Sequence, residues 1–285
     1  MTIFDFFNKV KLELNGLYDP GEIKALVNYL MQERLQMSFH DLLVRDKEVI
    51  PEKMVSVLMN DLNRMKTGEP IQHIIGFAWF NDLKILVNRN VLIPRPETEE
   101  MVSFIEDHFF KDDAVFLDIC TGSGCIALAL KKHFPGAFVY GADVSNEALE
   151  IASKNSDQLN LPVSWIKWDL LNEPDPQCEI PDLDLIVSNP PYICMDEFNS
   201  MHKNVTDFEP HLALFVPDDD PLIFYKEILK FSIRKLKNGG RIWVELNRAF
   251  AEDVAELFEN AGFCDVRIYR DTSANDRFVS AVKWS

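Results

Sequence analysis

Beyond Pro96, short apolar runs of strand length alternate with longer amphipathic segments almost to the end of the chain. Such alternation favours a parallel sheet, because each helix carries the chain back across the sheet and covers one of its faces. The expected strands are residues 115–119, 138–142, 163–168, 183–188, 241–246, 265–270 and 278–283, and the expected helices include residues 125–133, 147–158, 222–237 and 251–261. The last two strands follow each other without a helix, which places an antiparallel strand in a mainly parallel, seven-stranded α/β sheet.

The residues before about position 76 follow a different pattern, in which apolar side chains recur at helical spacing. Two such stripes are Ile23, Leu26, Val27, Leu30 and Met31, and Val55, Leu58, Met59 and Leu62. They predict a small helical bundle. Two strand-like runs, 77–80 and 83–87, then flank Asn81-Asp82, a pair that tolerates the left-handed conformations of a tight hairpin. We therefore expect an N-terminal helical domain at residues 1–76, a β-hairpin linker at 77–93 and an α/β domain at 94–285.

The protein is acidic, with 29 lysines and arginines, 46 aspartates and glutamates, and a net charge of −17. Proteins that bind nucleic acid non-specifically use a cationic surface, so this balance argues against direct nucleic acid binding. A hydrophobic content of 47% is too high for a disordered chain. No run approaches the roughly 20 apolar residues of a membrane helix, and residues 1–16 lack a signal-peptide pattern. We expect a folded, cytoplasmic protein without a membrane partner.

Neither the cysteines nor the histidines form a metal-binding pattern. The five cysteines stand at scattered positions without a Cys-x-x-Cys pair: Cys120, Cys125, Cys178, Cys194 and Cys264. This spacing favours reduced, mostly buried thiols. The six histidines are dispersed, and Asp218-Asp219-Asp220 before Pro221 is typical of a solvated loop at a helix start. No metal site is expected.

A glycine-containing loop follows the first expected strand of the sheet and reads Asp118-Ile119-Cys120-Thr121-Gly122-Ser123-Gly124. Ligands of open α/β sheets bind beyond the carboxyl ends of the strands, so the loop belongs at such a crevice. Glycine lets a ligand approach the backbone, and Asp143, after the second strand, can accept hydrogen bonds from both ribose hydroxyls of a nucleoside. The loop and Asp143 together predict an adenosine site. The alternative is a strand-to-helix turn that needs glycine for steric reasons alone.

A second motif, Asn189-Pro190-Pro191-Tyr192, directly follows the apolar strand 183–188. Proline restricts both itself and the residue before it, so the Asn189 side-chain oxygen and the Pro190 carbonyl are expected to point outward from a stiff segment. Two such acceptors would hold both N–H groups of a planar amide or aromatic amine and turn its nitrogen lone pair toward an electrophile. Tyr192 can pack on the planar group. Catalysis would then be positioning without a strong base; the alternative is a proline-rich loop that only ends a strand.

The glycine loop lacks the GxGxxG spacing of dinucleotide folds and the lysine of nucleotide-triphosphate loops. It resembles the first motif of S-adenosylmethionine-dependent methyltransferases, where glycine is more usual at the position of Cys120. With the Asn-Pro-Pro-Tyr turn, it is similar to amino-methyltransferases that act on glutamine amides or on exocyclic amines of nucleic-acid bases.

Four further segments resemble signatures of the bacterial release-factor glutamine methyltransferases, the PrmC/HemK family. They are residues 68–76 (GEPIQHIIG), 91–99 (VLIPRPETE), 208–214 (FEPHLAL) and 276–278 (DRF). The resemblance implies a class I (Rossmann-like) methyltransferase fold. It also implies methyl transfer from S-adenosylmethionine to N5 of the glutamine in the Gly-Gly-Gln loop of peptide chain release factors, with S-adenosylhomocysteine as product.

The resemblance also assigns roles. The implied cofactor-binding residues are Asp118, Cys120, Thr121, Gly122, Ser123, Gly124, Asp143, Asp169, Leu170 and Asn189, and the implied catalytic residues are Asn189, Pro190, Pro191 and Tyr192. The helical domain would help to dock the release factor, and the protein would be a monomer. At residues 245–248 (ELNR) the family usually carries glycine and then glutamine; Asn247 can still adopt the left-handed conformations of a turn.

Two other readings of the whole chain stay open at this point. One is methylation of another glutamine, such as one in a ribosomal protein, or of a nucleic-acid base; the other is a non-catalytic cofactor-binding scaffold. The segment Pro94-Arg95-Pro96 is similarly open. It is either a rigid elbow in which Arg95 pairs with Glu97 or Glu99, or part of the wall of the active-site cleft.

Overall fold

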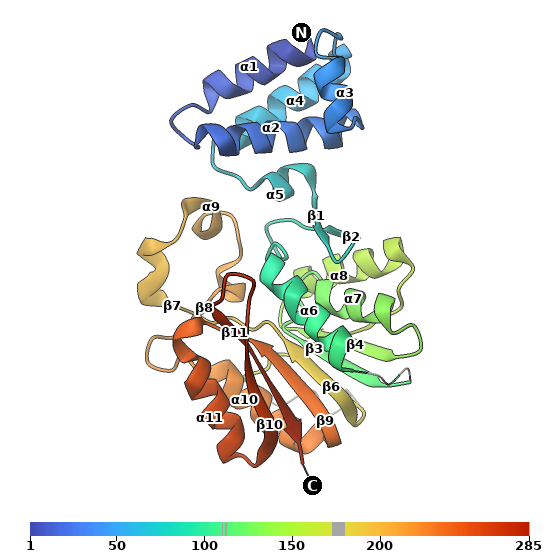
Figure 1. Ribbon diagram of the computed structural model, residues 1–285, viewed down its shortest axis with the longest axis vertical. Coiled ribbons are helices and arrows are strands. Elements are labelled where there is room, and N and C mark those ends of the chain that lie inside the picture. Colours follow the sequence, from blue (N-terminus) through green and yellow to red (C-terminus); the bar gives the residue numbers. More distant parts are fainter. Residues whose placement is uncertain (110, 112, 173–179, 285) are drawn as a thin grey trace. The chain divides into compact units, whose positions relative to one another are not determined.

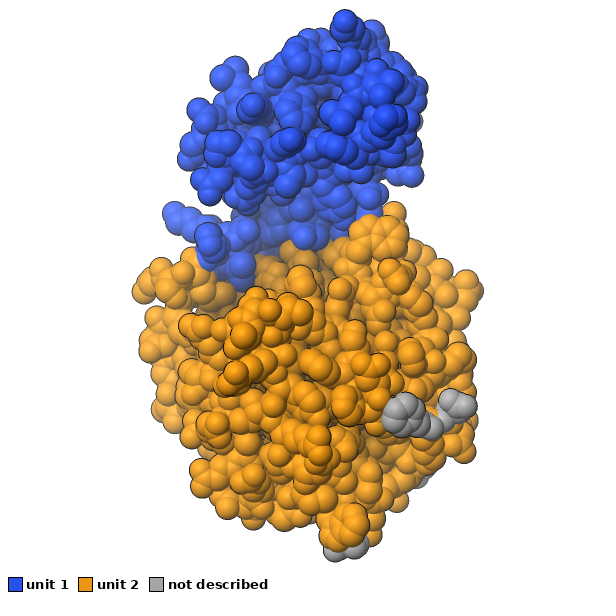
Figure 2. Space-filling view, viewed as in Figure 1, with its two compact units in different colours: residues 1–77, 202–208 blue, residues 78–201, 209–285 orange. Residues whose placement is uncertain are grey.

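The computed structural model describes residues 1–109, 111, 113–172 and 180–284 (Figure 1). The chain forms two compact units, coloured separately in Figure 2. The first contains residues 1–77 and 202–208, and the second contains residues 78–201 and 209–285. The inclusion of residues 202–208 in the first unit was not predicted, and the three-part division at residues 76 and 93 stays a prediction. None of the described helices is both long and apolar enough to cross a membrane.

The first unit is helical, as predicted. Its elements are α1 (Ile3–Glu13), α2 (Pro20–Leu35), α3 (Phe39–Val44), α4 (Glu52–Met65), α5 (Ile71–Ile75) and α9 (Lys203–Thr206). Capping boxes at Thr2 and Ser38 start α1 and α3 by satisfying free backbone N–H groups. The predicted stripes contribute Ile23, Val27, Leu30, Met31, Leu58 and Leu62 to the buried core. Leu26, Val55 and Met59 are only partly buried.

The predicted hairpin is present as β1 (Phe77–Phe80) and β2 (Leu83–Leu86). Asn81 and Asp82 have φ angles of 46° and 56°, the left-handed pair that a tight two-residue hairpin turn requires. The Asn155 side chain accepts a hydrogen bond from the Leu86 N–H at 2.7 Å and donates one to the Leu86 carbonyl at 3.2 Å. The buried Asn155 therefore satisfies both backbone groups of Leu86 and ties the end of β2 to the helix that contains Asn155.

The second unit is built on a seven-stranded sheet in the order β10-β11-β9-β6-β3-β4-β5. The strands are β3 (Val115–Ile119), β4 (Phe138–Asp143), β5 (Ser164–Lys167), β6 (Leu183–Ser188), β9 (Leu236–Glu245), β10 (Phe263–Arg270) and β11 (Asp276–Lys283). Strands β5, β4, β3, β6 and β9 pair in parallel, whereas β11 is antiparallel to β9 and to β10. The mainly parallel sheet with an antiparallel strand is confirmed.

Helices cover both faces of this sheet, as the alternation predicts (Figure 1). One hydrophobic cluster contains residues of α6 (Pro96–His108), α7 (Cys125–His133) and α8 (Asn146–Leu159), and the other contains residues of α10 (Ile223–Lys235) and α11 (Ala251–Asn260). The remaining elements are β7 (Ile193–Cys194), η1 (Met195–Ser200), η2 (His211–Ala213), β8 (Phe215–Val216) and η3 (Arg248–Phe250). The small β7-β8 pair and α6 were not predicted.

The boundary between α10 and β9 was predicted wrongly. The sequence suggests a helix to residue 237 and a strand from 241, whereas α10 ends at Lys235 and β9 begins at Leu236. Leu236 is extended and pairs with Leu183 of β6, and a register shift follows in β6 between Leu183 and Leu185. This tertiary pairing overrides the helical pattern of the local sequence.

Two glycines leave room for the indole ring of Trp165, a residue of β5 in the same sheet. A Cβ at Gly141 of β4 would lie 2.4 Å from the Trp165 ring, and one at Gly124, which starts α7, would lie 2.6 Å from it. Gly124 also has a φ of +81°. Its place in the loop is therefore explained by packing and backbone conformation together.

We expect Gly141→Ala to lower the free energy of unfolding by about 1–3 kcal/mol, because the new methyl group overlaps the Trp165 ring. In a Trp165→Leu background the same change should cost much less, since the ring is gone. Urea unfolding of the four proteins in this double-mutant cycle measures the coupling. Equal costs of Gly141→Ala in both backgrounds would contradict the steric explanation.

Candidate active site

A cavity of about 240 Å³ opens beyond the carboxyl ends of β3, β4 and β6. It is lined by Asn90, Val91, Leu92, Ile119, Cys120, Gly122, Asp143, Val144, Ser145, Ala148, Trp168, Asp169, Leu170, Leu171, Asn189, Pro191, Pro210, Leu212, Ala213 and Phe224. The strand order reverses around β3, and crevices at such a point are where open α/β sheets bind ligands. The glycine loop and the Asn-Pro-Pro-Tyr turn therefore meet at one cavity.

Asp143 and Gly122 form the polar corner of this cavity. The Asp143 carboxylate accepts the Gly122 N–H at 2.8 Å and the Ser145 N–H at 2.9 Å. Burial raises the pKa of Asp143, and those N–H donors oppose the shift. The carboxylate still has acceptor capacity for a hydroxyl donor. Gly122 has a φ of +55°, and a Cβ there would meet no atom within 4 Å, so a side chain would fill open space beside the cavity. This corner fits the ribose and backbone contacts of a nucleoside.

Four of the predicted cofactor residues, Asp118, Thr121, Ser123 and Gly124, do not line the cavity. Asp118 is fully buried and accepts hydrogen bonds from the Thr121 hydroxyl at 2.5 Å and the Ala127 N–H at 3.2 Å. Burial raises its pKa to about 7. These bonds join the end of β3 to the start of α7, so Asp118 supports the loop from behind. Direct cofactor contacts of the four residues stay a prediction.

Cys120 occupies the loop position where glycine is more usual, and its backbone is left-handed, with a φ of 60°. A Cβ in that conformation costs about 1–2 kcal/mol. The loop therefore keeps a glycine-like backbone although the glycine is absent. Burial, followed by the charges of Asp143 and Asp118, raises the pKa of the Cys120 thiol well above its usual value. The neutral thiol forms part of the cavity wall and is not an activated nucleophile.

The Asn-Pro-Pro-Tyr turn presents Asn189 and Pro191 to the cavity. Pro190 is buried, and the Tyr192 hydroxyl turns away toward Glu245, to which it donates a hydrogen bond at 3.1 Å. The Asn189 side-chain NH₂ donates to the Thr98 hydroxyl oxygen at 3.0 Å. The turn is thus held from behind by side chains of α6 and β9.

Sequence reasoning missed the two residues behind Asn189. Glu245 is 1% exposed and accepts hydrogen bonds from Thr98 at 2.7 Å and from Tyr192. Burial raises the pKa of Glu245 to about 7, while both hydroxyl donors and the Arg277 charge oppose the shift. The available signal was a lone acidic residue at the end of the apolar run Ile242–Val244, because a buried carboxylate requires polar partners.

Arg95 pairs with neither Glu97 nor Glu99, so the ion pair that belonged to the elbow interpretation is not found. Its guanidinium lies 2.7 Å from the buried Glu209 carboxylate, whose other oxygen accepts the Ile93 N–H at 3.0 Å. Glu99 instead accepts the Asn81 N–H at 2.7 Å. The Glu209 bonds join two chain segments, 91–95 and 209–213, that both contribute residues to the cavity wall.

The left-handed turn considered for Asn247 is also not found. Asn247 has a φ of −70° and caps η3, and its NH₂ donates to Glu197 at 3.0 Å and to the Tyr192 carbonyl at 3.5 Å. Where the family usually carries glycine, this chain has a side chain that ties the end of β9 to the Asn-Pro-Pro-Tyr turn.

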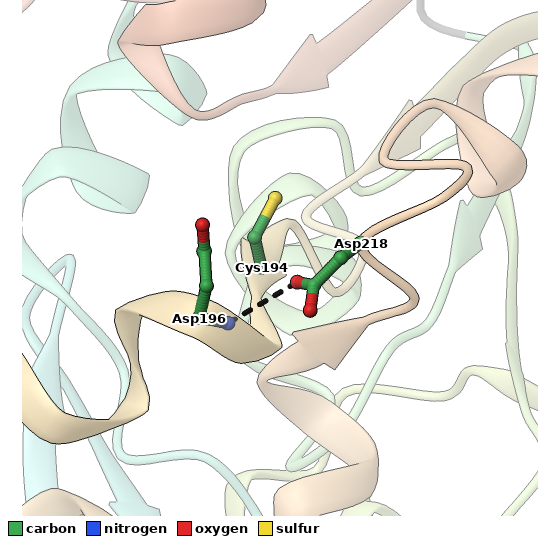
Figure 3. Close-up of side chains that lie close together, drawn as sticks. All are labelled: Cys194, Asp196 and Asp218. Carbon is green, nitrogen blue, oxygen red and sulfur yellow. Dashed lines mark hydrogen bonds between the residues drawn. The ribbon is translucent and has the colours of Figure 1, made fainter.

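One group of possible metal ligands occurs among the described residues, at Cys194, Asp196 and Asp218 (Figure 3). Their ligand atoms lie within 4.8 Å of one another, and Asp218 accepts the Asp196 N–H at 3.1 Å. Both aspartates are exposed, and burial raises the pKa of the Cys194 thiol. The site is empty. Asp220, in the same acidic run, pairs with Lys226, and Cys178 lies outside the described residues.

Comparison with known proteins gives family matches in both units. Residues 98–207 match the Methyltransferase small domain family, and residues 11–76 match the PrmC N-terminal domain family. A release factor glutamine methyltransferase of Bacteroides thetaiotaomicron is 38% identical, over 95% of this chain and 97% of the relative. One of Flavobacterium psychrophilum is 36% identical, over 98% of both chains. The crystal structure of a methyltransferase from Pyrococcus furiosus has a TM-score of 0.55 at 19% identity and covers 79% of this chain and 99% of that one, which shows the shared fold.

Cys120→Gly should be more stable than Cys120→Ala by about 1 kcal/mol, because only alanine keeps a Cβ in the left-handed conformation. At an ordinary position the order is reversed, since glycine loses more backbone entropy on folding. The free energies of unfolding of both variants in urea provide the measurement. An alanine variant as stable as the glycine variant would contradict the presence of strain at this position.

Proposed function

We propose, since the chain belongs to the release factor glutamine methyltransferase family, that it methylates N5 of the glutamine in the Gly-Gly-Gln motif of peptide chain release factors. The methyl donor is S-adenosylmethionine and the second product is S-adenosylhomocysteine. The observation that carries the proposal is that one cavity is lined both by Gly122 and Asp143 and by Asn189.

The donor side of the cavity is assigned to the glycine loop and the ends of β4 and β5. When bound, S-adenosylmethionine supplies a methyl group on a sulfonium centre, which makes the methyl carbon electrophilic. Asp143 accepts hydrogen bonds from the ribose hydroxyls, and Gly122 leaves room for the ligand beside the backbone. Asp169 and Leu170 border the adenine. Cys120 forms part of the cavity wall. The loop that supports the methionine part of the cofactor is held by Asp118, Thr121, Ser123 and Gly124.

The acceptor side is assigned to the Asn-Pro-Pro-Tyr turn. The Asn189 side-chain oxygen and the Pro190 carbonyl accept the two N–H groups of the glutamine amide, and Pro191 and Tyr192 bound the space for its plane. These bonds orient the nitrogen lone pair toward the methyl carbon. The new N–C bond forms as the S–C bond breaks, and the nitrogen then loses one proton to solvent. The rate advantage comes from orientation and electrostatics and requires no strong base.

We infer the partner surface from the charges and the family match. Residues 1–75 carry nine basic and eleven acidic side chains, so most of the net charge of −17 lies in the rest of the chain. We assign release-factor docking to the near-neutral helical unit that contains the PrmC N-terminal match. The acidity of the rest of the chain disfavours a nucleic-acid substrate. A monomeric protein stays a prediction.

Incubation with S-adenosylmethionine and purified, unmodified release factor should add one methyl group to the Gly-Gly-Gln peptide, detected by mass spectrometry. Asn189→Ala should lower the turnover about 100-fold or more, because an acceptor that orients the amide is lost. Cofactor binding should be largely kept, since the glycine loop is intact. Near-normal activity of this variant would contradict the positioning mechanism, and an unmethylated peptide with bound cofactor would point to another protein substrate.

Asp143→Ala should weaken the binding of S-adenosylhomocysteine by about 10–100-fold, because hydrogen bonds to a charged group are lost. Isothermal titration calorimetry gives the dissociation constant. Asp169→Ala serves as a comparison at the adenine end, with a smaller expected effect. Unchanged affinity of the Asp143 variant would remove the carboxylate from the ribose contact.

A further inference from the structure

We propose that Thr98 and Glu245 are positioning residues that orient the side-chain amide of Asn189, so that its oxygen faces the cavity. This inference deepens the proposed function and rests on it, because Asn189 is the residue that would hold the glutamine amide. Neither Thr98 nor Glu245 lines the cavity, whereas Asn189 does. They act on the substrate through Asn189.

Three elements bring these side chains together. Thr98 lies in the first turn of α6, where Pro96 starts the helix. Glu245 is the last residue of β9, which pairs in parallel with β6, and Asn189 follows β6 directly. Thr98 is 2% exposed and Glu245 is 1% exposed, so bulk water does not compete for the hydrogen bonds of their polar groups.

The hydrogen bonds that link Tyr192, Glu245, Thr98 and Asn189 form a line in which the donor and acceptor of each bond are fixed. The Tyr192 hydroxyl donates to Glu245 Oε1 at 3.1 Å, and the Thr98 hydroxyl donates to Glu245 Oε2 at 2.7 Å. Both carboxylate oxygens thus act as acceptors, which is the role of the ionised form. The Asn189 Nδ2 then lies 3.0 Å from Thr98 Oγ1.

The chemistry of the threonine hydroxyl decides which end of the asparagine amide faces it. A hydroxyl has one hydrogen, and Thr98 uses it on Glu245, so only lone pairs remain for Asn189. The NH₂ end of Asn189 therefore faces Thr98, and the Oδ1 end points the other way. A flipped amide would bring two acceptors into contact. The Glu245 carboxylate thus fixes which group donates in each of these hydrogen bonds. As a result, the Asn189 Oδ1 is presented as an acceptor to the substrate N–H.

A buried acidic side chain at this place requires an explanation other than stability. Taking a carboxylate out of water is unfavourable, and an apolar side chain of similar volume is often at least as stable. The end of an apolar strand would ordinarily carry an apolar residue. The line from Glu245 through Thr98 to Asn189 supplies the reason for the carboxylate.

The test uses Thr98→Val, which keeps the shape of the side chain and removes the hydroxyl, with Thr98→Ser as the matched control. Thr98→Val should lower kcat about 10–100-fold, with the dissociation constant of S-adenosylhomocysteine changed less than about twofold. Thr98→Ser should stay within about threefold of the wild type. Glu245→Leu should also lower kcat, since the Thr98 hydroxyl loses its acceptor and is then free to donate its hydrogen to Asn189. Urea unfolding confirms that each variant is folded.

Two results would overturn the proposal: a Thr98→Val variant as active as the wild type, or a Thr98→Ser variant as impaired as Thr98→Val.

A second readout does not need turnover. In ¹⁵N-asparagine-labelled protein, the Asn189 side-chain NH₂ signal is identified by its loss in Asn189→Ala. Thr98→Val should speed its hydrogen exchange about tenfold, because its donor has lost its partner. Unchanged exchange would overturn the positioning role. If the wild type leaves the release factor unmethylated, the proposed function fails, and the exchange experiment still decides the role of Thr98.

Discussion

The parallel pairing of β3 with β4 on one side and β6 on the other is the constraint on which the site depends. Asp118 of β3 is in register with Gly141 of β4 and with Val187 of β6. Parallel strands in register end at the same edge of the sheet, so the segments that follow them must lie side by side. The glycine loop, Asp143 and Asn189 are brought together in this way. Their proximity follows from backbone pairing that involves none of their side chains.

The same edge concentrates buried carboxylates, each with a different structural task. Asp118 joins the loop to α7, Glu209 joins two segments of the cavity wall, and Glu245 holds Thr98 and Tyr192. Burial disfavours the charged form of each group unless its oxygens are satisfied. Because Glu209 is bonded to the segment 91–95 and Glu245 is bonded to Thr98 and Tyr192, a small displacement of these segments leaves a buried acceptor unsatisfied. The carboxylates therefore specify one arrangement of the cavity wall, at a cost in stability.

Local patterns predicted much of this fold, and the failures share a cause. The alternation of strands and helices, the antiparallel strand and the left-handed Asn81-Asp82 turn were predicted, because each depends on residues close in sequence. Arg95 with Glu209 and Thr98 with Glu245 are separated by 114 and 147 residues, so no local pattern indicates the pairing. The predicted boundary between α10 and β9 was wrong for the same reason, since the pairing of Leu236 with β6 decides where the strand begins. For the site, the motifs included the residues that border the cavity, namely Cys120, Gly122, Asp143 and Asn189. The motifs did not distinguish these cavity residues from supporting residues such as Asp118.

Cys120 shows how strongly the surroundings determine the loop. Left-handed backbone is unfavourable for a residue with a Cβ, yet Cys120 adopts it. The next residues leave little freedom: the Thr121 N–H bonds the Ala142 carbonyl at 2.9 Å, the Thr121 hydroxyl bonds Asp118, and the Gly122 N–H bonds Asp143. Strain at one residue persists when several bonds over-determine its conformation. The loss of glycine is therefore tolerated at position 120. It is not expected to be tolerated at Gly124, where the backbone is left-handed and the Trp165 ring also occupies the space of a side chain.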